Sequence, residues 1–381
     1  MSTVMISCGE ASGDLYAGAL VAALRERDPD CRISGFGGDR LREAGADLEG
    51  DYRGFAVTGL TEAIRVLPRS YAMIRRLVER ARRERPDVLV TIDFPDFNFR
   101  LASAVSKLGI PVVYYISPQL WAWRHGRIHS MKRFVSKVLV IFPFEAAIYE
   151  QESIPVEFVG HPLVDLIPDV EPRGPFLTRL GLAGAAPTVA LLPGSRRNEL
   201  RATAAILADA ARLVSQRVAN VQFVVARAPH LDDELFTPFT TAGLRLSIVE
   251  GLTDDVLNAA DTVVTASGTA TVQTALHERP MVIVYRLSPL TYRLGRRFVR
   301  VNAFGMANLV AGKTVVPELI QDDFTPDRVA AETVRFLTDD ALAANTRAEL
   351  AIVRDRLGGK GASGRAADAI LEVARRSKST R

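Results

Sequence analysis

Two acidic side chains lie where the first apolar run of the chain gives way to a helical pattern. Glu10 and Asp14 belong to the sequence Gly-Glu-Ala-Ser-Gly-Asp at residues 9–14, which follows the apolar run at residues 4–7. Small residues at a helix start let backbone N–H groups approach a ligand, but two carboxylates would repel a phosphate. We therefore expect this turn to contact sugar hydroxyls or to supply an acid or base. A plain helix start capped by Ser12 is the structural alternative.

A second acidic segment follows another apolar run. Residues 92–98 read Ile-Asp-Phe-Pro-Asp-Phe-Asn and come directly after the run at residues 88–92. The carboxyl end of a strand is the ligand edge of an open α/β sheet. Neighbouring phenyl rings lower the local dielectric and raise the pKa of a carboxylate, which suits a general base. A loop of Asx turns that caps a helix is the structural alternative.

Both tryptophans of the chain occur together in an aromatic and basic segment. Residues 117–124 read Ser-Pro-Gln-Leu-Trp-Ala-Trp-Arg, and further cations follow. Such a segment can stack on sugar faces or hold acyl and phosphate groups, although two core tryptophans beside a solvated charged face would look the same. His125 and His129 are four residues apart, but no third ligand accompanies them, so we expect no metal site.

Two further turns have the composition of phosphate-binding turns. Residues 192–196 read Leu-Pro-Gly-Ser-Arg, residues 266–271 read Ala-Ser-Gly-Thr-Ala-Thr, and each follows an apolar run. Backbone amides, hydroxyls and the Arg196 guanidinium would suit a diphosphate at a helix start. Neither turn carries the lysine of a P-loop, which favours a nucleotide-sugar diphosphate over ATP hydrolysis. Ordinary turns between strand and helix are the alternative.

These turns need a scaffold of buried strands. Short apolar runs occur at residues 4–7, 33–36, 88–92, 112–116, 138–142 and 156–159, and again at 189–192, 221–225, 246–249, 263–265 and 281–285. Helical patterns separate most of them, which is typical of parallel sheets covered on both faces. We therefore predict an α/β protein with two Rossmann-like domains facing a cleft. The expected boundaries are 1–168, 169–355 and a helix at 356–381 that returns to the first domain.

Composition excludes several classes of protein. The chain has 381 residues, and 48 Lys and Arg against 44 Asp and Glu give a net charge of +4, which argues against a nucleic-acid partner. Two cysteines exclude a disulfide framework. No signal peptide or membrane span is apparent, so we expect a cytoplasmic protein. Basic amphipathic stretches at residues 64–85 and 292–300 favour peripheral contact with an anionic membrane, with an ordinary surface helix as the alternative.

The motifs together resemble one family. The chain carries GEASGD (9–14), PDFN (95–98), SPQLWAWR (117–124), LPGSR (192–196) and ASGTAT (266–271) in that order, followed by NLVAG (308–312) and VPELIQ (316–321). This set resembles the lipid-A-disaccharide synthases, which are similar to inverting glycosyltransferases of the GT-B fold. The resemblance implies transfer of 2,3-diacylglucosamine from UDP to 2,3-diacylglucosamine 1-phosphate. It also implies a Gram-negative cell and the cytoplasmic face of its inner membrane.

The resemblance implies roles for individual residues. Asp96 is the expected base, with Glu10 as its rival. The residues expected to bind the nucleotide are Gly194, Ser195, Arg196, Ser267, Gly268, Thr269, Gln273 and Asn308. Those expected to bind the acceptor are Ser12, Asp14, Asn98, Gln119, Trp121, Trp123 and Arg124.

One residue departs from the family pattern, because Gln273 stands where the family usually carries a glutamate for the ribose hydroxyls. We expect neither a cofactor nor a metal, and association of copies stays open. Apolar contacts to acyl chains are expected at residues 64–78. The alternative functions are a UDP-sugar epimerase or hydrolase of the same fold and a non-catalytic nucleotide-sugar-binding protein.

Overall fold

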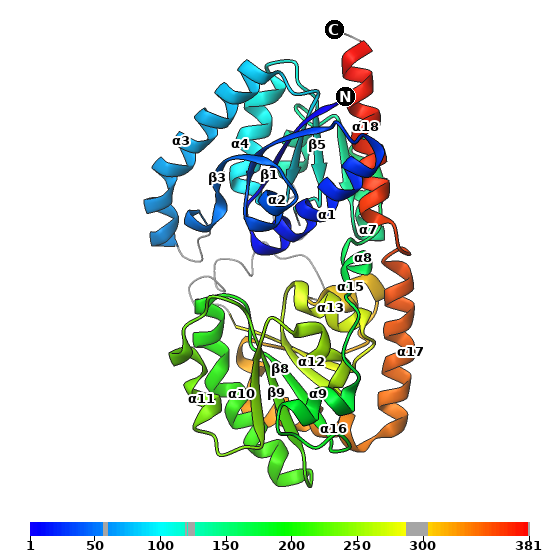
Figure 1. Ribbon diagram of the computed structural model, residues 1–381. Helices are drawn as coiled ribbons and strands as arrows, with labels where there is room; N and C mark the ends of the chain where they lie inside the picture. The colour runs from blue at the N-terminus through cyan, green and yellow to red at the C-terminus, as the bar shows by residue number, and fades with distance from the viewer. Residues whose placement is uncertain (56–59, 119, 121–125, 287–303, 380–381) are drawn as a thin grey trace. The chain divides into compact units, whose positions relative to one another are not determined.

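The computed structural model describes residues 1–55, 60–118, 120, 126–286 and 304–379. The chain forms two compact units, one of Met1–Leu166 with Leu357–Arg381 and one of Ile167–Arg356. Each unit is a parallel sheet with helices packed against it (Figure 1). The expectation of an α/β protein with two parallel-sheet domains is confirmed.

The first unit contains a seven-stranded sheet in the order β3-β2-β1-β4-β5-β6-β7. Its strands are β1 (Thr3–Cys8), β2 (Arg32–Gly37), β3 (Asp47–Asp51), β4 (Val88–Ile92), β5 (Val112–Tyr115), β6 (Lys137–Val140) and β7 (Val156–Phe158). Every residue of β4 and β5 is buried, as expected of central strands with both faces covered. Strand β3 has no counterpart among the predicted strands, because its sequence Asp-Leu-Glu-Gly-Asp is polar and it lies at the sheet edge.

The helices of the first unit are α1 (Ala11–Arg27), α2 (Asp39–Glu43), α3 (Leu60–Glu84), α4 (Pro95–Ser106), α6 (Gly126–Met131), α7 (Pro143–Gln151), α8 (Leu163–Leu166) and α18 (Ala362–Ser379). Although α18 is at the end of the chain, it packs beside α1 (Figure 1). Asp165 accepts hydrogen bonds from the amides of Gly361 at 2.6 Å and Ser363 at 3.1 Å, which anchors the start of α18. Arg27 and Asp368 form an ion pair at 2.5 Å that ties α1 to α18.

The second unit contains a six-stranded sheet in the order β10-β9-β8-β11-β12-β13. Its strands are β8 (Thr188–Leu192), β9 (Gln222–Arg227), β10 (Leu246–Glu250), β11 (Thr262–Ala266), β12 (Met281–Tyr285) and β13 (Glu318–Ile320). Its helices are α9 (Arg173–Arg179), α10 (Arg197–Arg217), α11 (Thr237–Thr240), α12 (Thr253–Ala259), α13 (Thr269–Leu276), α15 (Met306–Ala311), α16 (Pro326–Thr338) and α17 (Asp340–Arg356). Strand β13 was not predicted, since three residues are too few for a recognisable pattern.

Both sheets reverse their strand order at one point. The reversal lies between β1 and β4 in the first unit and between β8 and β11 in the second. In open parallel sheets the ligand crevice lies outside the carboxyl ends of the strands at this point. The turns after β1, β4, β8 and β11 are the Gly-Glu-Ala-Ser-Gly-Asp, Asp-Phe-Pro-Asp, Pro-Gly-Ser-Arg and Ser-Gly-Thr turns. The fold therefore brings the four predicted motifs to the edges where α/β proteins bind ligands.

Candidate active site

The turn after β4 has a strained backbone. Asp93 and Phe94 both have positive φ angles, 45° and 49°, a region that residues other than glycine seldom adopt. The ring of Phe94 lies so close to Gly9 that a Cβ at Gly9 would meet it at 2.0 Å. The turns after β1 and β4 are therefore packed against each other and accept only glycine at residue 9. Such strain concentrates at functional sites, where surrounding contacts hold it in place.

Asn98 supplies those contacts from the first turns of α4. Its Nδ2 donates to the carbonyls of Ser7, Ile92 and Asp93 at 3.2, 3.1 and 2.8 Å. Its Oδ1 accepts from the hydroxyl of Ser7 at 2.7 Å. The side chain is fully buried. In this structure the polar atoms of Asn98 are engaged in joining β1 to β4. A contact of Asn98 with the acceptor stays a prediction.

Asp96 is the accessible carboxylate of the same turn. It lies in the first turn of α4, and 64% of its side chain is exposed. Arg127, from α6, donates from Nη2 to Oδ1 of Asp96 at 2.7 Å. The guanidinium of Arg127 also lies 5.6 Å from the ring centroid of Phe99. The arginine therefore orients a carboxylate that solvent or a ligand can still reach.

Glu10 and Ser12 lie at the start of α1. Glu10 is the N-cap residue, so the helix begins one residue before Ser12, and the alternative in which Ser12 caps the helix is wrong. Both side chains are half-buried. They therefore keep some surface at the ligand edge of β1.

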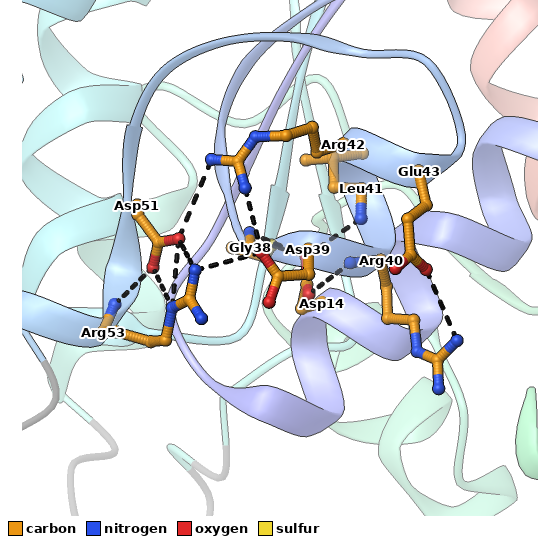
Figure 2. Close-up of polar contacts among 10 residues, drawn as sticks. Asp14, Gly38, Asp39, Arg40, Leu41, Arg42, Glu43, Asp51 and Arg53 are labelled. Carbon is orange, nitrogen blue, oxygen red and sulfur yellow. Dashed lines mark hydrogen bonds and ion pairs between the residues drawn. The ribbon is translucent and has the colours of Figure 1, made fainter.

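Asp14 lies deeper on the same helix. Figure 2 shows its carboxylate at the start of α2, where it accepts from the amides of Gly38 at 2.8 Å, Arg40 at 2.9 Å and Leu41 at 3.2 Å. Asp14 is 3% exposed. A Cβ at Gly38 would lie 2.6 Å from Oδ2 of Asp14, so the contact needs glycine there. In this structure the carboxylate of Asp14 therefore positions α2, and its expected contact with the acceptor stays a prediction.

The surroundings of Asp14 are polar and charged. Arg53 donates to Asp39 at 3.0 Å, and Arg42 donates to the same Asp39 oxygen at 2.9 Å (Figure 2). Burial, followed by the nearby charge of Asp14, raises the pKa of Tyr52 to about 12. The phenol is therefore neutral at physiological pH and is not a base.

Four predicted acceptor residues, Gln119, Trp121, Trp123 and Arg124, lie outside the described residues. The chain enters this segment through Ile116, whose φ of 58° is again left-handed. Leu120 is described and is 2% exposed. The segment therefore starts at the carboxyl end of β5, beside the turn after β4.

In the second unit, the turn between β8 and α10 already holds an anion of its own chain. One carboxylate oxygen of Glu199 accepts from the amides of Ser195 at 3.0 Å and Arg196 at 3.3 Å. The other oxygen accepts from the Arg196 guanidinium at 3.3 Å. Gly194 has a φ of 127°, and a Cβ there would lie 2.8 Å from Oε2 of Glu199. The donors expected to hold a diphosphate are thus arranged around a single negative group.

The turn between β11 and α13 is more open. Gly268 and Thr269 are exposed, and Ser267 is half-buried. Gly268 has a φ of 148°, which places the chain in a conformation that favours glycine. Thr271 donates from its hydroxyl to the carbonyl of Gly268 at 2.8 Å and so holds the turn. The hydroxyls of Ser267 and Thr269 lie at the ligand edge of β11.

Gln273 lies four residues after Thr269, on the same face of α13. Its Nε2 donates to Oδ1 of Asp254 at 2.9 Å, and Nε2 of His277 lies 2.8 Å from the same oxygen.

Asn308, in contrast, is 2% exposed. Its Nδ2 donates to Val316 O at 2.9 Å and to Glu318 Oε1 at 2.7 Å, while its Oδ1 accepts from the amides of Val315 and Val316. In this structure Asn308 therefore shapes the loop after α15, and its contact with the nucleotide stays a prediction.

Sequence reasoning missed Glu199, Asp254 and the pairing of Arg127 with Asp96. Glu199 could have been found, because a glutamate three residues after the N-cap is the pattern of a capping box. Asp254 is 19 residues from its partner Gln273, and no local pattern connects them.

The basic helix α3 has both buried and exposed apolar side chains. Met73, Ile74 and Leu77 are buried in the core, so they do not form a groove for acyl chains. Leu67 and Tyr71 are the large apolar side chains that the described part of α3 exposes, at 39% and 49%. The second basic stretch, residues 292–300, lies outside the described residues.

The described residues contain neither a cluster of metal-ligating side chains nor a helix that could span a membrane. In that part of the chain no three His, Cys, Asp or Glu side chains gather as a metal site would require. No helix among the same residues has the length and apolar character needed to cross a membrane.

Comparison with solved structures places the fold. A UDP-N-acetylglucosamine 2-epimerase from Neisseria meningitidis bound to UDP-N-acetylglucosamine aligns with a TM-score of 0.68 at 12% identity, over 97% of this chain and 100% of that one. The glycosyltransferase of kitacinnamycin aligns with a TM-score of 0.64 at 18% identity, over 98% and 99%. At these identities the likeness concerns the fold alone, which is that of GT-B glycosyltransferases and related UDP-sugar enzymes.

Comparison of sequences is more specific. A family model described as lipid-A-disaccharide synthetase matches residues 4–370. The lipid-A-disaccharide synthase of Koribacter versatilis is 44% identical over 99% of this chain and 100% of its own length. That of Myxococcus xanthus is 42% identical over 97% of each chain. These relatives do not favour the epimerase or the non-catalytic alternative. The chain belongs to the lipid-A-disaccharide synthetase family, whose members are glycosyltransferases of lipid A biosynthesis.

Proposed function

We propose that this enzyme joins UDP-2,3-diacylglucosamine to 2,3-diacylglucosamine 1-phosphate with inversion. The 6-hydroxyl of the acceptor attacks the anomeric carbon of the donor, and the bond from that carbon to the diphosphate oxygen breaks. UDP leaves with the electron pair, and the β-1,6-linked disaccharide 1-phosphate forms. Membership of the family over residues 4–370 carries this proposal. The motif turns at the reversal point of each sheet support it.

We propose that Asp96 takes the proton of the attacking hydroxyl. Its exposed carboxylate at the ligand edge of β4 can reach a substrate, as a general base must. Arg127 holds one oxygen at 2.7 Å, which orients the carboxylate toward one side. Glu10, at the N-cap of α1, is the rival for this role. The strained turn at Asp93 and Phe94, fixed by Asn98, sets the position of the helix that carries Asp96.

The second unit is proposed to hold UDP. The amides of Ser195 and Arg196, the Arg196 guanidinium and the Ser267–Thr269 turn offer donors at two neighbouring strand ends. Donors fixed in advance stabilise charge that develops on a leaving diphosphate without reorganising during the reaction. Before the diphosphate can bind these amides, the carboxylate of Glu199 has to release the hydrogen bonds that it accepts from them in this structure.

Product analysis tests the reaction. The enzyme is incubated with UDP-2,3-diacylglucosamine, with and without 2,3-diacylglucosamine 1-phosphate, and the products are analysed by mass spectrometry. We expect disaccharide 1-phosphate and UDP in equal amounts only when the acceptor is present. UDP release without acceptor would indicate a hydrolase, and UDP binding without turnover would indicate a binding protein.

We further propose that the first unit contacts the anionic cytoplasmic surface of the inner membrane through α3. Exposed Leu67 and Tyr71 lie on this helix with exposed Arg69, Arg75 and Arg76, and a basic helix with apolar side chains suits such a surface. Sedimentation with phosphatidylglycerol vesicles, compared with phosphatidylcholine vesicles, tests this. Binding to both alike, or equal binding of a Leu67→Ser and Tyr71→Ser double variant, would contradict it.

A further inference from the structure

Gln273 carries an amide, whereas the resemblance to the family implies a carboxylate at this position. The two groups differ in that an amide has one accepting oxygen and one donating nitrogen, and which of them faces a ligand depends on how the amide is turned. In this structure a neighbouring residue sets the orientation of the amide. Gln273 lies on α13 in line with Thr269, and its side chain is half-buried.

That neighbour is Asp254, in the first turn of α12. Its Oδ1 lies 2.9 Å from Nε2 of Gln273. A carboxylate oxygen only accepts hydrogen bonds, so the nitrogen of the amide has to face Asp254. The oxygen of the amide then faces away from Asp254. Among the described residues, no group donates a hydrogen bond to this Oε1.

His277 completes the arrangement. Its Nε2 is 2.8 Å from the same Oδ1, one helical turn after Gln273. The side chains of Asp254 and His277 are only 18% and 8% exposed. Two donors from one face of α13 therefore converge on one carboxylate oxygen, and this fixes the carboxylate against α13.

We propose that Asp254, held by His277, positions Gln273 so that its amide oxygen accepts hydrogen bonds from the ribose hydroxyls of UDP. The inference rests on the proposed function, because it concerns the nucleotide of that reaction. The amide of Gln273 thus offers an accepting oxygen, as a glutamate would. The negative charge lies instead on Asp254, which bonds to the nitrogen of the amide. Asp254 and His277 are positioning residues that do not touch the nucleotide.

Calorimetric binding of UDP and of 2′,3′-dideoxy-UDP to the full-length protein tests the proposal. The ratio of the two dissociation constants reports on ribose contacts alone and is unaffected by a general loss of stability. The wild type should prefer UDP by roughly tenfold or more, since a site built to bond hydroxyls rejects an analogue without them.

In Asp254→Asn the orientation is no longer fixed, because an asparagine can either donate to or accept from Gln273. The preference for UDP should fall by about fivefold, corresponding to the loss of roughly one hydrogen bond. Asp255→Asn is the matched control. It removes the same charge one residue along α12, where the carboxylate accepts from the amide of Glu171 at 2.7 Å, and it should keep the ratio of the wild type.

Exchange of the two groups sharpens the test. Gln273→Glu alone places two carboxylates against each other and should weaken UDP binding. Adding Asp254→Asn restores a donor opposite Glu at 273, so the double variant should regain the affinity and the preference of the wild type. Should Asp254→Asn fail to fold, His277→Leu removes the other bond to Asp254 and should also lower the preference.

Two results would count against the inference. An unchanged preference in Asp254→Asn and His277→Leu, with UDP still bound, would overturn the positioning role and leave the proposed function standing. A wild-type protein that folds but binds no UDP would overturn the proposed function together with the inference.

Discussion

Arg127 donates a hydrogen bond from Nη2 to Oδ1 of Asp96 at 2.7 Å. The two residues come from α6 and α4, so the contact joins the helices that follow β5 and β4. The guanidinium holds the exposed carboxylate in one orientation. A carboxylate held in this way is better placed to accept a proton from a reacting hydroxyl than one that rotates freely. Arg127 is therefore part of what makes Asp96 a specific candidate for the base.

Asp96→Asn removes the proton acceptor and keeps the size of the side chain. We expect turnover to fall by roughly 10²–10⁴-fold, the usual contribution of a general base. UDP binding, measured by calorimetry, should stay within roughly twofold of the wild type.

The control for this variant is Asp39→Asn, which changes an exposed, arginine-paired aspartate in the first turn of α2. It should retain nearly all activity. Strong residual turnover in Asp96→Asn would remove Asp96 as the base and favour Glu10, which Glu10→Gln then tests.

Asn98→Ala tests the contact that holds the strained turn. The change leaves the carbonyls of Ser7, Ile92 and Asp93 without the amide that they share, in a fully buried place. Buried groups that lose their partners cost about 1–3 kcal/mol each, so we expect a loss of at least about 2 kcal/mol in unfolding free energy. Chemical denaturation of the full chain measures it.

Asn345→Ala, at an exposed position of α17, is the comparison and should change stability by less than about 0.5 kcal/mol. If Asn98→Ala were equally harmless, Asn98 would not be the residue that fixes the turn. A role in contacting the acceptor would then be favoured.

Glu199→Gln tests the turn after β8. The carboxylate and a diphosphate would compete for the same amides of Ser195 and Arg196. A neutral amide accepts hydrogen bonds more weakly than a carboxylate, so UDP displaces the side chain of the variant more easily. The affinity for UDP should therefore rise by roughly tenfold, because UDP no longer has to break a charge-assisted hydrogen bond. Calorimetry with UDP measures the change.

Asp209→Asn provides the reference for Glu199→Gln, because it removes the same charge from α10 at a surface pair with Arg212. Its affinity for UDP should match the wild type. Weaker binding in Glu199→Gln would mean that the carboxylate supports the nucleotide site rather than occupying it.

The sequence predicted the sheets well because buried parallel strands are continuous apolar runs. It failed at β3, whose polar residues are tolerated at an edge. The motif turns were placed correctly at strand ends, but the roles of polar residues within them were harder to predict. Asp14 and Asn98 have the composition of ligand contacts, yet their partners Gly38 and Ser7 lie 24 and 91 residues away. Whether such a residue faces a ligand or the core depends on these distant partners, which no local pattern reveals.

Burial of His161 makes the stability of the folded chain depend on pH under acidic conditions. Its ring is buried between Tyr16 and Phe142, with centroids at 5.9 and 5.3 Å, and its Nδ1 accepts from the amide of Leu163 at 3.2 Å. Burial lowers the pKa of His161 from 6.5 to about 3. Above pH 6.5 the side chain is neutral in both states and has no effect. Between about pH 6.5 and 3 the unfolded chain binds a proton that the folded chain does not, so stability falls as the pH falls, by up to about 1.4 kcal/mol per pH unit.

His161→Asn keeps an acceptor for the amide of Leu163 but cannot take up a proton. Its thermal midpoint should therefore fall less than that of the wild type between pH 7 and pH 5, even if the variant is less stable at pH 7 because it fills the space less well. Differential scanning calorimetry at both pH values compares the two slopes. His129→Asn is the control, since His129 is 69% exposed and its loss should leave the acid sensitivity of the wild type. Parallel slopes for wild type and His161→Asn would mean that acid acts through the paired carboxylates and not through this buried ring.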